Sequence, residues 1–474
     1  MADEFMARAL GCAGHPLVQT PNLDRLASRG VRFTNAYTPS PMCVPARGAF
    51  QTGLHVDKVG CWSSAEPYNG FPASFGHVLR DNGVRVASVG KLHFKTSLTD
   101  NGFDPELLPL HVVDGIGWMP SLLRRDPLDF DSSSFANDVG PGESSYSRYD
   151  KRVEKQTRQW LNDPTNTDSP WVLFCSLVSP HYPLRSPDAF FDLYPVEDMD
   201  WPFCYAPDER PTHPVVKQVM DLSAYDKHFT PEKVRIARAA YYGLCSYVDD
   251  MVGNLIETLE ENDLIEDTRI IFTSDHGEML GNHGAWTKML MYEDSVSIPL
   301  ILGGPGIEQG KVNSTPVTLL DIAAMVCRDH GCVAFADQLD GQCLGTLSQT
   351  NQPERAVLSQ YHDGWSPTGY FMVRWNQWKF IHYQDYPPQL FDLENDPQER
   401  RDLGADPGYR SQREDGFEQL TQWLDPAEVT QRAFQDQEKC IERLGGVVGV
   451  RQNAALHFNY TPISDETHQV DPEP

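Results

Sequence analysis

The segment Cys43-Val44-Pro45-Ala46-Arg47 combines residue types that can do covalent chemistry on an anion. Pro45 fixes its own φ and biases Val44 toward an extended conformation, so we expect a helix to begin near Pro45, with Cys43 exposed at the mouth of a turn. Arg47 then lies about one helical turn from Cys43. A thiol beside a guanidinium and helix N-terminal amides has a lowered pKa and can hold an anion. An ordinary buried cysteine before a helix would share this short pattern, so the rest of the chain must decide.

Further polar side chains follow apolar stretches that read as strands. They are Lys91 and His93 after residues 84–89, His181 after 171–178, and Asp275 and His276 after 269–273. Helical patterns around 74–82 and 230–262 separate these stretches, and strand–helix alternation predicts a mostly parallel sheet covered on both faces. Because ligands bind at the carboxyl ends of such strands, we expect all these side chains to share one site.

The remaining elements divide the chain into three parts. Residues 1–351 are predicted to form the catalytic domain, with further helices at 20–30 and 316–328 and a strand at 31–38. Residues 352–444 form a smaller subdomain with a hairpin at 370–383 and two polar helices, and residues 445–474 form a tail. The Pro- and Asp-rich stretches 105–143 and 194–229 look like insertions that form rims or lids.

Bulk properties restrict the partners. The formal net charge of −28 argues against nucleic acid or an anionic membrane, and it requires a local cationic pocket for any anionic substrate. The ten cysteines show no paired spacing, which is typical of reduced thiols rather than a disulfide framework. No apolar run is long enough for a membrane span and no signal peptide is evident, so we expect a cytoplasmic protein.

The Cys43 segment continues to Thr52-Gly53, and this extended pattern resembles that of the type I sulfatases of the alkaline phosphatase superfamily. The resemblance runs from Met1 to about Asp402 and includes the closing signature at 389–397. It implies a three-layer α/β sandwich with a mostly parallel central sheet and a smaller C-terminal α+β subdomain. It also implies that a maturation enzyme oxidises Cys43 to formylglycine, whose hydrate attacks sulfur and forms a covalent sulfated intermediate.

The resemblance further implies a divalent metal. The expected ligands are Asp3, the modified Cys43, Asp275 and His276, with Glu4 as a possible further ligand where many relatives have a second aspartate. We expect Ca²⁺, with Mn²⁺ or Mg²⁺ as alternatives, because oxygen ligands suit hard cations. Taken alone, Asp275-His276 could be a turn with a capping aspartate.

Six residues match the catalytic groups of the family. They are Cys43, Arg47, Lys91, His93, His181 and Lys288. The resemblance implies that Arg47 and Lys91 stabilise charge, that one histidine deprotonates the formylglycine hydrate, and that the other protonates the leaving alcohol. We expect His181 to be that acid and Lys288 to clamp the sulfuryl oxygens, but the division between His93 and His181 stays open. His283 is expected only to shape its loop.

The family also begins with an apolar strand just before the stretch that matches Met1 to Phe5. The sequence starts at Met1, so we expect either a truncated chain or a misassigned start.

For the substrate, residues 90–94 and 369–374 resemble the choline-sulfatase-like and arylsulfatase branch. Four aromatic residues could form a cage for a quaternary ammonium or an aryl group, although such residues more often pack in cores. They are Trp62, Trp118, Tyr361 and Trp365. The expected activity is hydrolysis of a small sulfate monoester, by a homo-oligomer that uses the tail. One alternative is a phosphonate monoester or phosphodiester hydrolase on the same scaffold, and another is a non-catalytic binding protein.

Overall fold

The computed structural model describes residues 1–128 and 131–454, and its centre is one sheet built from two groups of strands. The first group has the order β4 (Glu106–Leu110), β3 (Arg85–Lys91), β6 (Trp171–Ser176). The second has the order β10 (Lys311–Asn313), β1 (Gly30–Phe33), β9 (Leu300–Gly303), β8 (Ile270–Thr273). All pairs are parallel except those of β9, which is antiparallel to both neighbours.

The first residues of the chain join the two groups. Ala2 bridges in parallel to Ser274, just after β8, and Asp3 bridges in parallel to Pro180, after β6. The result is a mostly parallel central sheet, as the sequence predicts.

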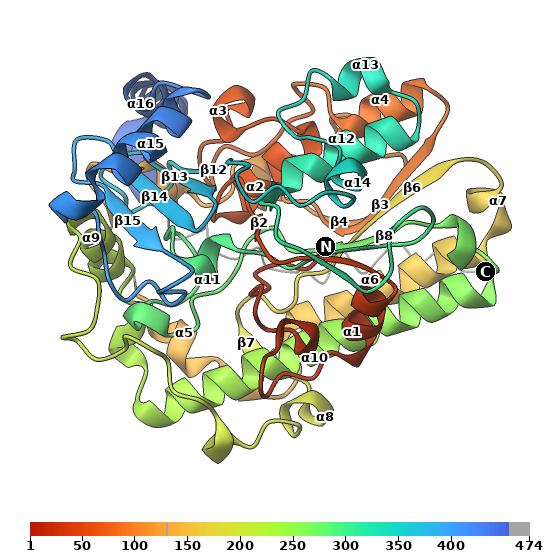
Figure 1. Ribbon diagram of the computed structural model, residues 1–474, viewed down its shortest axis with the longest axis horizontal. Helices are drawn as coiled ribbons and strands as arrows, with labels where there is room; N and C mark the ends of the chain where they lie inside the picture. The colour runs from red at the N-terminus through yellow and green to blue at the C-terminus, as the bar shows by residue number, and fades with distance from the viewer. Residues whose placement is uncertain (129–130, 455–474) are drawn as a thin grey trace.

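Helices cover both faces of this sheet (Figure 1). On one face α12 (Leu319–Asp329) packs against α2 (Cys43–Thr52) and α4 (Phe75–Asp81). On the other face α10 (Pro231–Glu261) packs against α1 (Pro21–Ser28) and α6 (Ser145–Asn162). Helix α10 starts where predicted, because the Thr230 hydroxyl accepts a hydrogen bond from the Lys233 amide and Pro231 occupies the first turn. The three layers form the predicted sandwich.

Short elements complete this domain. They are β2 (Ala36–Tyr37), α3 (Val56–Val59), α5 (Ser133–Asn137), β5 (Val139–Pro141), α7 (Pro164–Thr167), β7 (Leu184–Ser186), α8 (Asp188–Phe191), α9 (Pro214–Ser223), α11 (Glu293–Val296), β11 (Val317–Thr318), α13 (Val333–Ala336) and α14 (Leu344–Leu347). No helix of the described residues is both long and apolar enough to cross a membrane. All ten cysteines are free thiols.

The C-terminal subdomain is an antiparallel sheet with helices beside it, drawn in blue in Figure 1. Its strands follow one another as β12 (Val357–Tyr361), β13 (Tyr370–Trp375), β14 (Trp378–Tyr383) and β15 (Gln389–Asp392). The polar helices α15 (Arg410–Thr421) and α16 (Pro426–Arg443) follow, then α17 (Gly446–Asn453). The remainder of the predicted tail, 455–474, lies outside the described residues.

Three local expectations differ from the structure. The stretch 31–38 is split into β1 and β2, because after Phe33 the chain leaves the central sheet and pairs with β11 instead. The helix expected from 316 begins only at Leu319, since Val317 and Thr318 form β11. Residues 106–110 are not part of a rim: they form β4 and pair with β3.

Candidate active site

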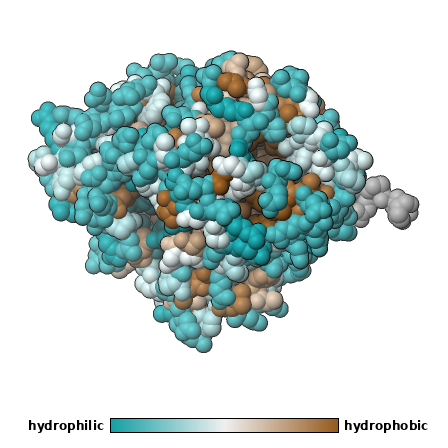
Figure 2. All heavy atoms as spheres, turned by 45° about the vertical axis from the view of Figure 1, so that its right-hand side comes forward, coloured by the Kyte–Doolittle hydropathy of each residue, from teal (hydrophilic) through white to brown (hydrophobic). Residues whose placement is uncertain are grey.

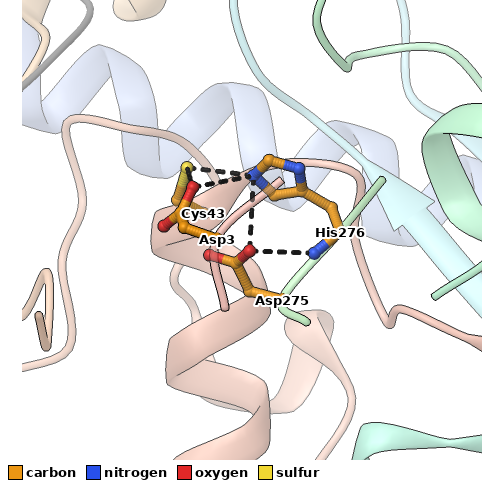
Figure 3. A group of neighbouring side chains, drawn as sticks. All are labelled: Asp3, Cys43, Asp275 and His276. Atoms are coloured by element: carbon orange, nitrogen blue, oxygen red, sulfur yellow. Dashed lines mark hydrogen bonds and ion pairs between the residues drawn. The ribbon is translucent and has the colours of Figure 1, made fainter. Parts of the chain in front are cut away.

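Four side chains that are far apart in the sequence meet at the carboxyl ends of the strands (Figure 3). Asp3 comes from the bridging segment, Cys43 is the first residue of α2, and Asp275 and His276 follow β8. Their ligand atoms all lie within 4.8 Å of one another. Cys43 Sγ lies 3.0 Å from His276 Nε2 and 3.7 Å from Asp3 Oδ1.

Two cations hold the carboxylates of this cluster. Arg47 donates from one nitrogen to Asp3 Oδ2 and from another to Asp275 Oδ2, each at 2.8 Å. Lys91 Nζ lies 2.6 Å from the same oxygen of Asp3. Burial opposes ionisation of Asp3, but Lys91 and Arg47 outweigh it and hold the pKa of the carboxyl well below its usual value.

Arg47 is positioned by groups on two strands. Its third nitrogen donates to the carbonyl of Lys91 at 2.7 Å and to the Ser176 hydroxyl at 2.9 Å. β3 and β6 together therefore fix the guanidinium. Because Arg47 lies on α2, these bonds also fix the position of that helix relative to the two strands. Ser176 carries no motif, and its contribution could not be found from the sequence.

Cys43 differs from the simple expectation in two respects. The helix begins at Cys43 itself rather than near Pro45, and the thiol is only 4% exposed. Burial, with the Asp3 carboxylate beside it, raises the pKa of the thiol to about 12 instead of lowering it. The unmodified cysteine is thus a neutral thiol at neutral pH and a poor nucleophile.

The donor set fits a hard divalent cation once residue 43 is oxidised. With a thiolate, two carboxylates and an imidazole it would suit a softer ion such as Zn²⁺. When Cys43 becomes an aldehyde hydrate, an oxygen stands where Sγ now lies, and oxygen donors predominate. His276 is oriented for this role, because its Nδ1 faces the Gly277 carbonyl at 3.0 Å and Nε2 points into the cluster.

Glu4, His181 and Lys288 form a second group next to the first. Lys288 Nζ lies 3.0 Å from Glu4 Oε2 and 2.8 Å from His181 Nε2. His181 Nδ1 faces the carbonyl of Tyr182 at 2.6 Å, so Nε2 is the acceptor of the Lys288 proton. Burial, together with Lys288 and Lys91, lowers the pKa of His181 well below its ordinary value.

Glu4 occupies an intermediate position between the two groups. Burial, with Glu278 nearby, raises the pKa of its carboxyl to about 8. Its Oε1 atom is buried and receives no hydrogen bond from an N–H or hydroxyl donor of the described residues. The Glu4 and Glu278 carboxyls instead share a hydrogen bond, which requires a proton on one of them and agrees with the raised pKa of Glu4. Glu278, which sequence analysis missed, accepts hydrogen bonds from the amides of Leu280 and Thr287, each at 2.7 Å, and so shapes the loop before Lys288.

Lys91 and His93 do not lie on the same strand. β3 ends at Lys91, and His93 adopts a left-handed conformation with φ +56°. His93 is buried, and burial together with the charges of Lys91 and Arg47 lowers the pKa of its imidazole well below the usual range. His283 packs on Tyr292 in the loop after β8, with ring centroids 4.4 Å apart.

Of the four aromatic residues that sequence analysis proposes for a cage, two line a cavity at the site and two do not. Trp118 and Trp365 line a cavity of about 30 Å³ that also contacts Glu4, His181 and Lys288. Trp62 instead packs in the C-terminal core and donates to Asp436, and Tyr361 stacks on Tyr370 with centroids 4.8 Å apart. Three aromatic residues that sequence analysis missed complete the cavity wall, namely Phe135, Tyr182 and Tyr225. They lie in insertions and loops without a recognisable motif.

A buried carboxylate–imidazole cluster, a nucleophile position at a helix N-terminus and three surrounding cations define a metal-dependent hydrolase of anionic esters. The sulfatase family profile matches residues 1–328, and a profile for the C-terminal part of N-sulphoglucosamine sulphohydrolase matches residues 281–425. The chain belongs to the sulfatase family and is a sulfuric ester hydrolase. Members of this family use a divalent metal and a formylglycine.

Relatives and solved structures agree with this assignment. The chain is 31% identical to choline-sulfatase of Rhizobium meliloti over 423 residues, which cover 86% of this chain and 82% of that one. It is also 31% identical to human arylsulfatase K, with 84% and 77% covered. The fold is similar to that of a phosphonate monoester hydrolase of Agrobacterium radiobacter, with a TM-score of 0.73 at 23% identity, covering 89% of this chain and 94% of that chain. At that identity the likeness concerns the fold alone.

Proposed function

We propose that the protein hydrolyses a small sulfate monoester whose alcohol part is a quaternary ammonium compound, with choline sulfate as the foremost candidate. The observation that carries this proposal is the aromatic cavity beside Lys288 and His181. The likeness to a choline-sulfatase points in the same direction. An aryl sulfate is the competing substrate, because the same aromatic walls would stack on a ring.

The cavity wall is made of aromatic pairs that hold one another in place. Trp118 and Trp365 lie edge to face with centroids 4.8 Å apart, and Phe135 stacks on Tyr182 at 4.0 Å. Tyr225 joins the two pairs, at 4.2 Å from Phe135 and 6.1 Å from Trp365. Ring faces attract a quaternary ammonium by about 2 kcal/mol or more when the site excludes water. At about 30 Å³ the cavity holds little more than a water molecule, so a quaternary ammonium group would enter only if the aromatic walls move apart.

The residues of the chain have distinct roles in this proposal. A formylglycine hydrate at position 43 would supply the attacking oxygen, and a divalent metal held by Asp3, Asp275 and His276 would supply charge neutralisation for the sulfuryl group. Arg47 and Lys91 balance the carboxylates, and Lys288 clamps a sulfuryl oxygen. His181, once Nε2 has taken up a proton from Lys288 or water, delivers that proton to the leaving alcohol oxygen, and His93 removes one from residue 43 so that the aldehyde returns as sulfate leaves.

For the ion, we propose Ca²⁺ or Mn²⁺. The carboxylates of Asp3 and Asp275 suit both, whereas the imidazole of His276 favours Mn²⁺, since Ca²⁺ takes oxygen ligands. Elemental analysis of the matured protein is expected to find one of these ions per chain. A stoichiometric content of Zn²⁺ would contradict the proposal.

The partners and the location are proposals as well. A maturation enzyme must reach Cys43 before folding buries it, since the thiol is only 4% exposed in the folded chain. The ten free cysteines favour a reducing, cytoplasmic compartment. Exposed Val447 and Val448 on α17 favour contact with a second copy, in line with a homo-oligomer.

The experiment compares kcat/KM for choline sulfate, 4-nitrophenyl sulfate and a phenyl phosphonate monoester, after co-expression with a maturation enzyme. We expect choline sulfate to be turned over best and the phosphonate worst. Greater efficiency on the phosphonate would reject the substrate class. The Cys43→Ala variant serves as control and is expected to lose about 10³-fold or more in kcat with an unchanged melting temperature. Mass spectrometry of the Cys43 peptide should show the aldehyde in the active protein only.

A further inference from the structure

Helix α6 carries one carboxylate on its buried side. Most residues on the face of the molecule shown in Figure 2 are hydrophilic, as is usual for a protein surface, and the outer side of α6 likewise exposes Lys151 and Lys155. Asp150 instead belongs to the inward stripe of the helix, between Tyr146 and Val153, and is fully buried. A buried charge is costly unless other groups bind it, so the partners of Asp150 indicate its task.

Those partners are two backbone amides in the turn that follows β6. The amide of Val178 donates to Asp150 Oδ1 and that of Ser179 to Oδ2, each at 2.7 Å. Both donor residues are buried, and both lie beyond the ladder that β6 forms with β3. A buried N–H without an acceptor is strongly disfavoured. The carboxylate therefore fixes the backbone of this turn.

The same turn carries His181. The amide of His181 donates to the carbonyl of Val178 at 3.0 Å, which closes the turn, and Nε2 of its ring lies 2.8 Å from Lys288 Nζ. The turn also contacts the candidate metal ligands, because the amide of Asp3 donates to the carbonyl of Ser179, at a longer distance of 3.4 Å. A shift of the turn would thus move His181 relative to Lys288.

Helix α6 contacts His181 a second time through Tyr146. This residue precedes Asp150 by one helical turn, so the two side chains lie on the same face of the helix. The rings of Tyr146 and His181 meet edge to face, with centroids 5.9 Å apart. The helix therefore holds both the ring and the backbone of His181, from the layer opposite α2.

We propose that Asp150 is a positioning residue for the reaction, which acts through the turn after β6 and keeps His181 Nε2 beside Lys288 and the aromatic cavity. This inference rests on the proposed function, in which His181 is the acid. Asp150 itself does not line the cavity, so its effect on the chemistry passes through His181. A displacement of about 1 Å at a reacting group can cost about 100-fold in rate.

The test is Asp150→Asn, measured with choline sulfate and with 4-nitrophenyl sulfate on the same matured sample. Asparagine keeps the shape, but its NH₂ group faces an amide that also donates, so one bond is lost and the turn shifts. We expect the ratio of kcat/KM for choline sulfate to that for 4-nitrophenyl sulfate to fall about tenfold or more, because only the alkoxide needs the proton. A smaller folded fraction affects both esters equally and cancels from this ratio.

Asp249 on α10 provides a matched control. It is also buried and also accepts from two backbone amides, those of Leu23 at 2.7 Å and Asn22 at 3.1 Å, at the start of α1. Burial raises the pKa of each aspartate to about 6, so both are ionised at neutral pH. Asp249→Asn is expected to weaken the fold but to leave the ratio between the two esters unchanged.

Two further measurements follow the route from Asp150 to His181. Exchange of the His181 amide hydrogen should become at least about tenfold faster in Asp150→Asn and stay unchanged in Asp249→Asn. In the double variant Asp150→Asn with His181→Gln, the ester ratio should equal that of His181→Gln alone, because both changes remove the same function.

An equal fall for both esters in Asp150→Asn would overturn the proposal, since that result is expected of an effect through Asp3 or through the fold as a whole. An unchanged ratio with unchanged exchange of the His181 amide would overturn it as well. His181→Gln tests the acid separately. Equal losses there would reject His181 and, with it, the role of Asp150, whereas a selective loss in His181→Gln alone would reject only the role of Asp150.

Discussion

At the scale of single residues, the candidate metal ligands and the side chains beside the aromatic cavity form two groups. Asp3, Asp275 and His276 converge on residue 43, whereas His181 and Lys288 face the aromatic cavity. His181 Nε2 accepts a hydrogen bond from Lys288 in this structure, so His181 can act as the acid only after Nε2 has taken up a proton. Lys91 and Arg47 are the cations that act most strongly on His93, whereas Lys288 and Lys91 act on His181. The two histidines therefore share Lys91, and only His181 also has Lys288 as a hydrogen-bond partner.

The first prediction uses this separation. His181→Gln is expected to lower kcat/KM about 10²–10⁴-fold for an alkyl sulfate, whose alkoxide needs a proton, but less than about tenfold for 4-nitrophenyl sulfate, which leaves without one. Steady-state kinetics on the two esters measure the difference. His93→Gln is the control and should slow both esters to the same extent. Equal losses for His181→Gln would remove it as the acid.

At the scale of elements, β3 and β6 are held so closely that only glycine fits at position 90. Gly90 has φ +104°, and a Cβ there would lie 2.1 Å from the Ser176 carbonyl oxygen. The neighbouring Lys91 carbonyl and the Ser176 hydroxyl both hold Arg47. The distance between these strands therefore fixes the guanidinium.

The second prediction follows from this contact. Gly90→Ala is expected to cost more than about 2 kcal/mol of unfolding free energy and to reduce activity, because β3 must move away from Ser176. Gly60→Ala is the matched control: its φ is +77°, but nothing lies within 4 Å of the added Cβ. It should cost only about 1 kcal/mol and leave kcat unchanged. Urea unfolding compares the two, and similar costs would contradict the steric explanation.

Helix α16 meets the catalytic domain through a half-buried carboxyl. Glu66 Oε2 accepts from the Ser63 hydroxyl at 2.9 Å and from Gln437 on α16 at 3.4 Å. Burial raises the pKa of Glu66 from 4.5 to about 8. An acid whose pKa is higher in the folded state stabilises the fold below the unfolded pKa, and this stability is lost as pH rises toward 8.

The third prediction concerns this pH window. Glu66→Gln keeps the two hydrogen-bond acceptor contacts but carries no ionisable proton. It is expected to be more stable than the parent by about 4 kcal/mol at pH 8 and by less than about 1 kcal/mol at pH 5. Urea unfolding at both values provides the measurement. A difference that does not change with pH would show that Glu66 is ionised in the folded protein.

At the scale of the whole molecule, the net charge of −28 opposes an anionic substrate. The cations Arg47, Lys91 and Lys288 are buried at the site. Their charges therefore act at short range, and the electrostatic potential outside the molecule stays negative. Salt screens this field over a Debye length of about 10 Å at 0.1 M.

The fourth prediction is a dependence on ionic strength. Raising NaCl from 10 to 200 mM is expected to increase kcat/KM for 4-nitrophenyl sulfate, an anion, by roughly twofold. For choline sulfate, which has no net charge, kcat/KM should stay constant. A fall in kcat/KM with salt for the anionic ester would mean that the entrance to the site is electropositive.

The sequence by itself indicated which residues are candidates for the chemistry. The segment from Cys43 to Gly53 and the polar residues after three apolar strands predicted the fold class and a single site, because parallel strands bring their carboxyl ends to one edge. Helix α10 and the hairpin of β13 and β14 were predictable from local capping and alternation.

Only the tertiary structure determined the pKa values at the site and the side chains that hold the site residues in position. The pKa of Cys43 is raised rather than lowered, because burial outweighs the helix terminus, and burial is a property of the packed molecule. Ser176, Glu278 and the wall residue Tyr225 carry no sequence signal, since each acts through a neighbour that is distant along the chain.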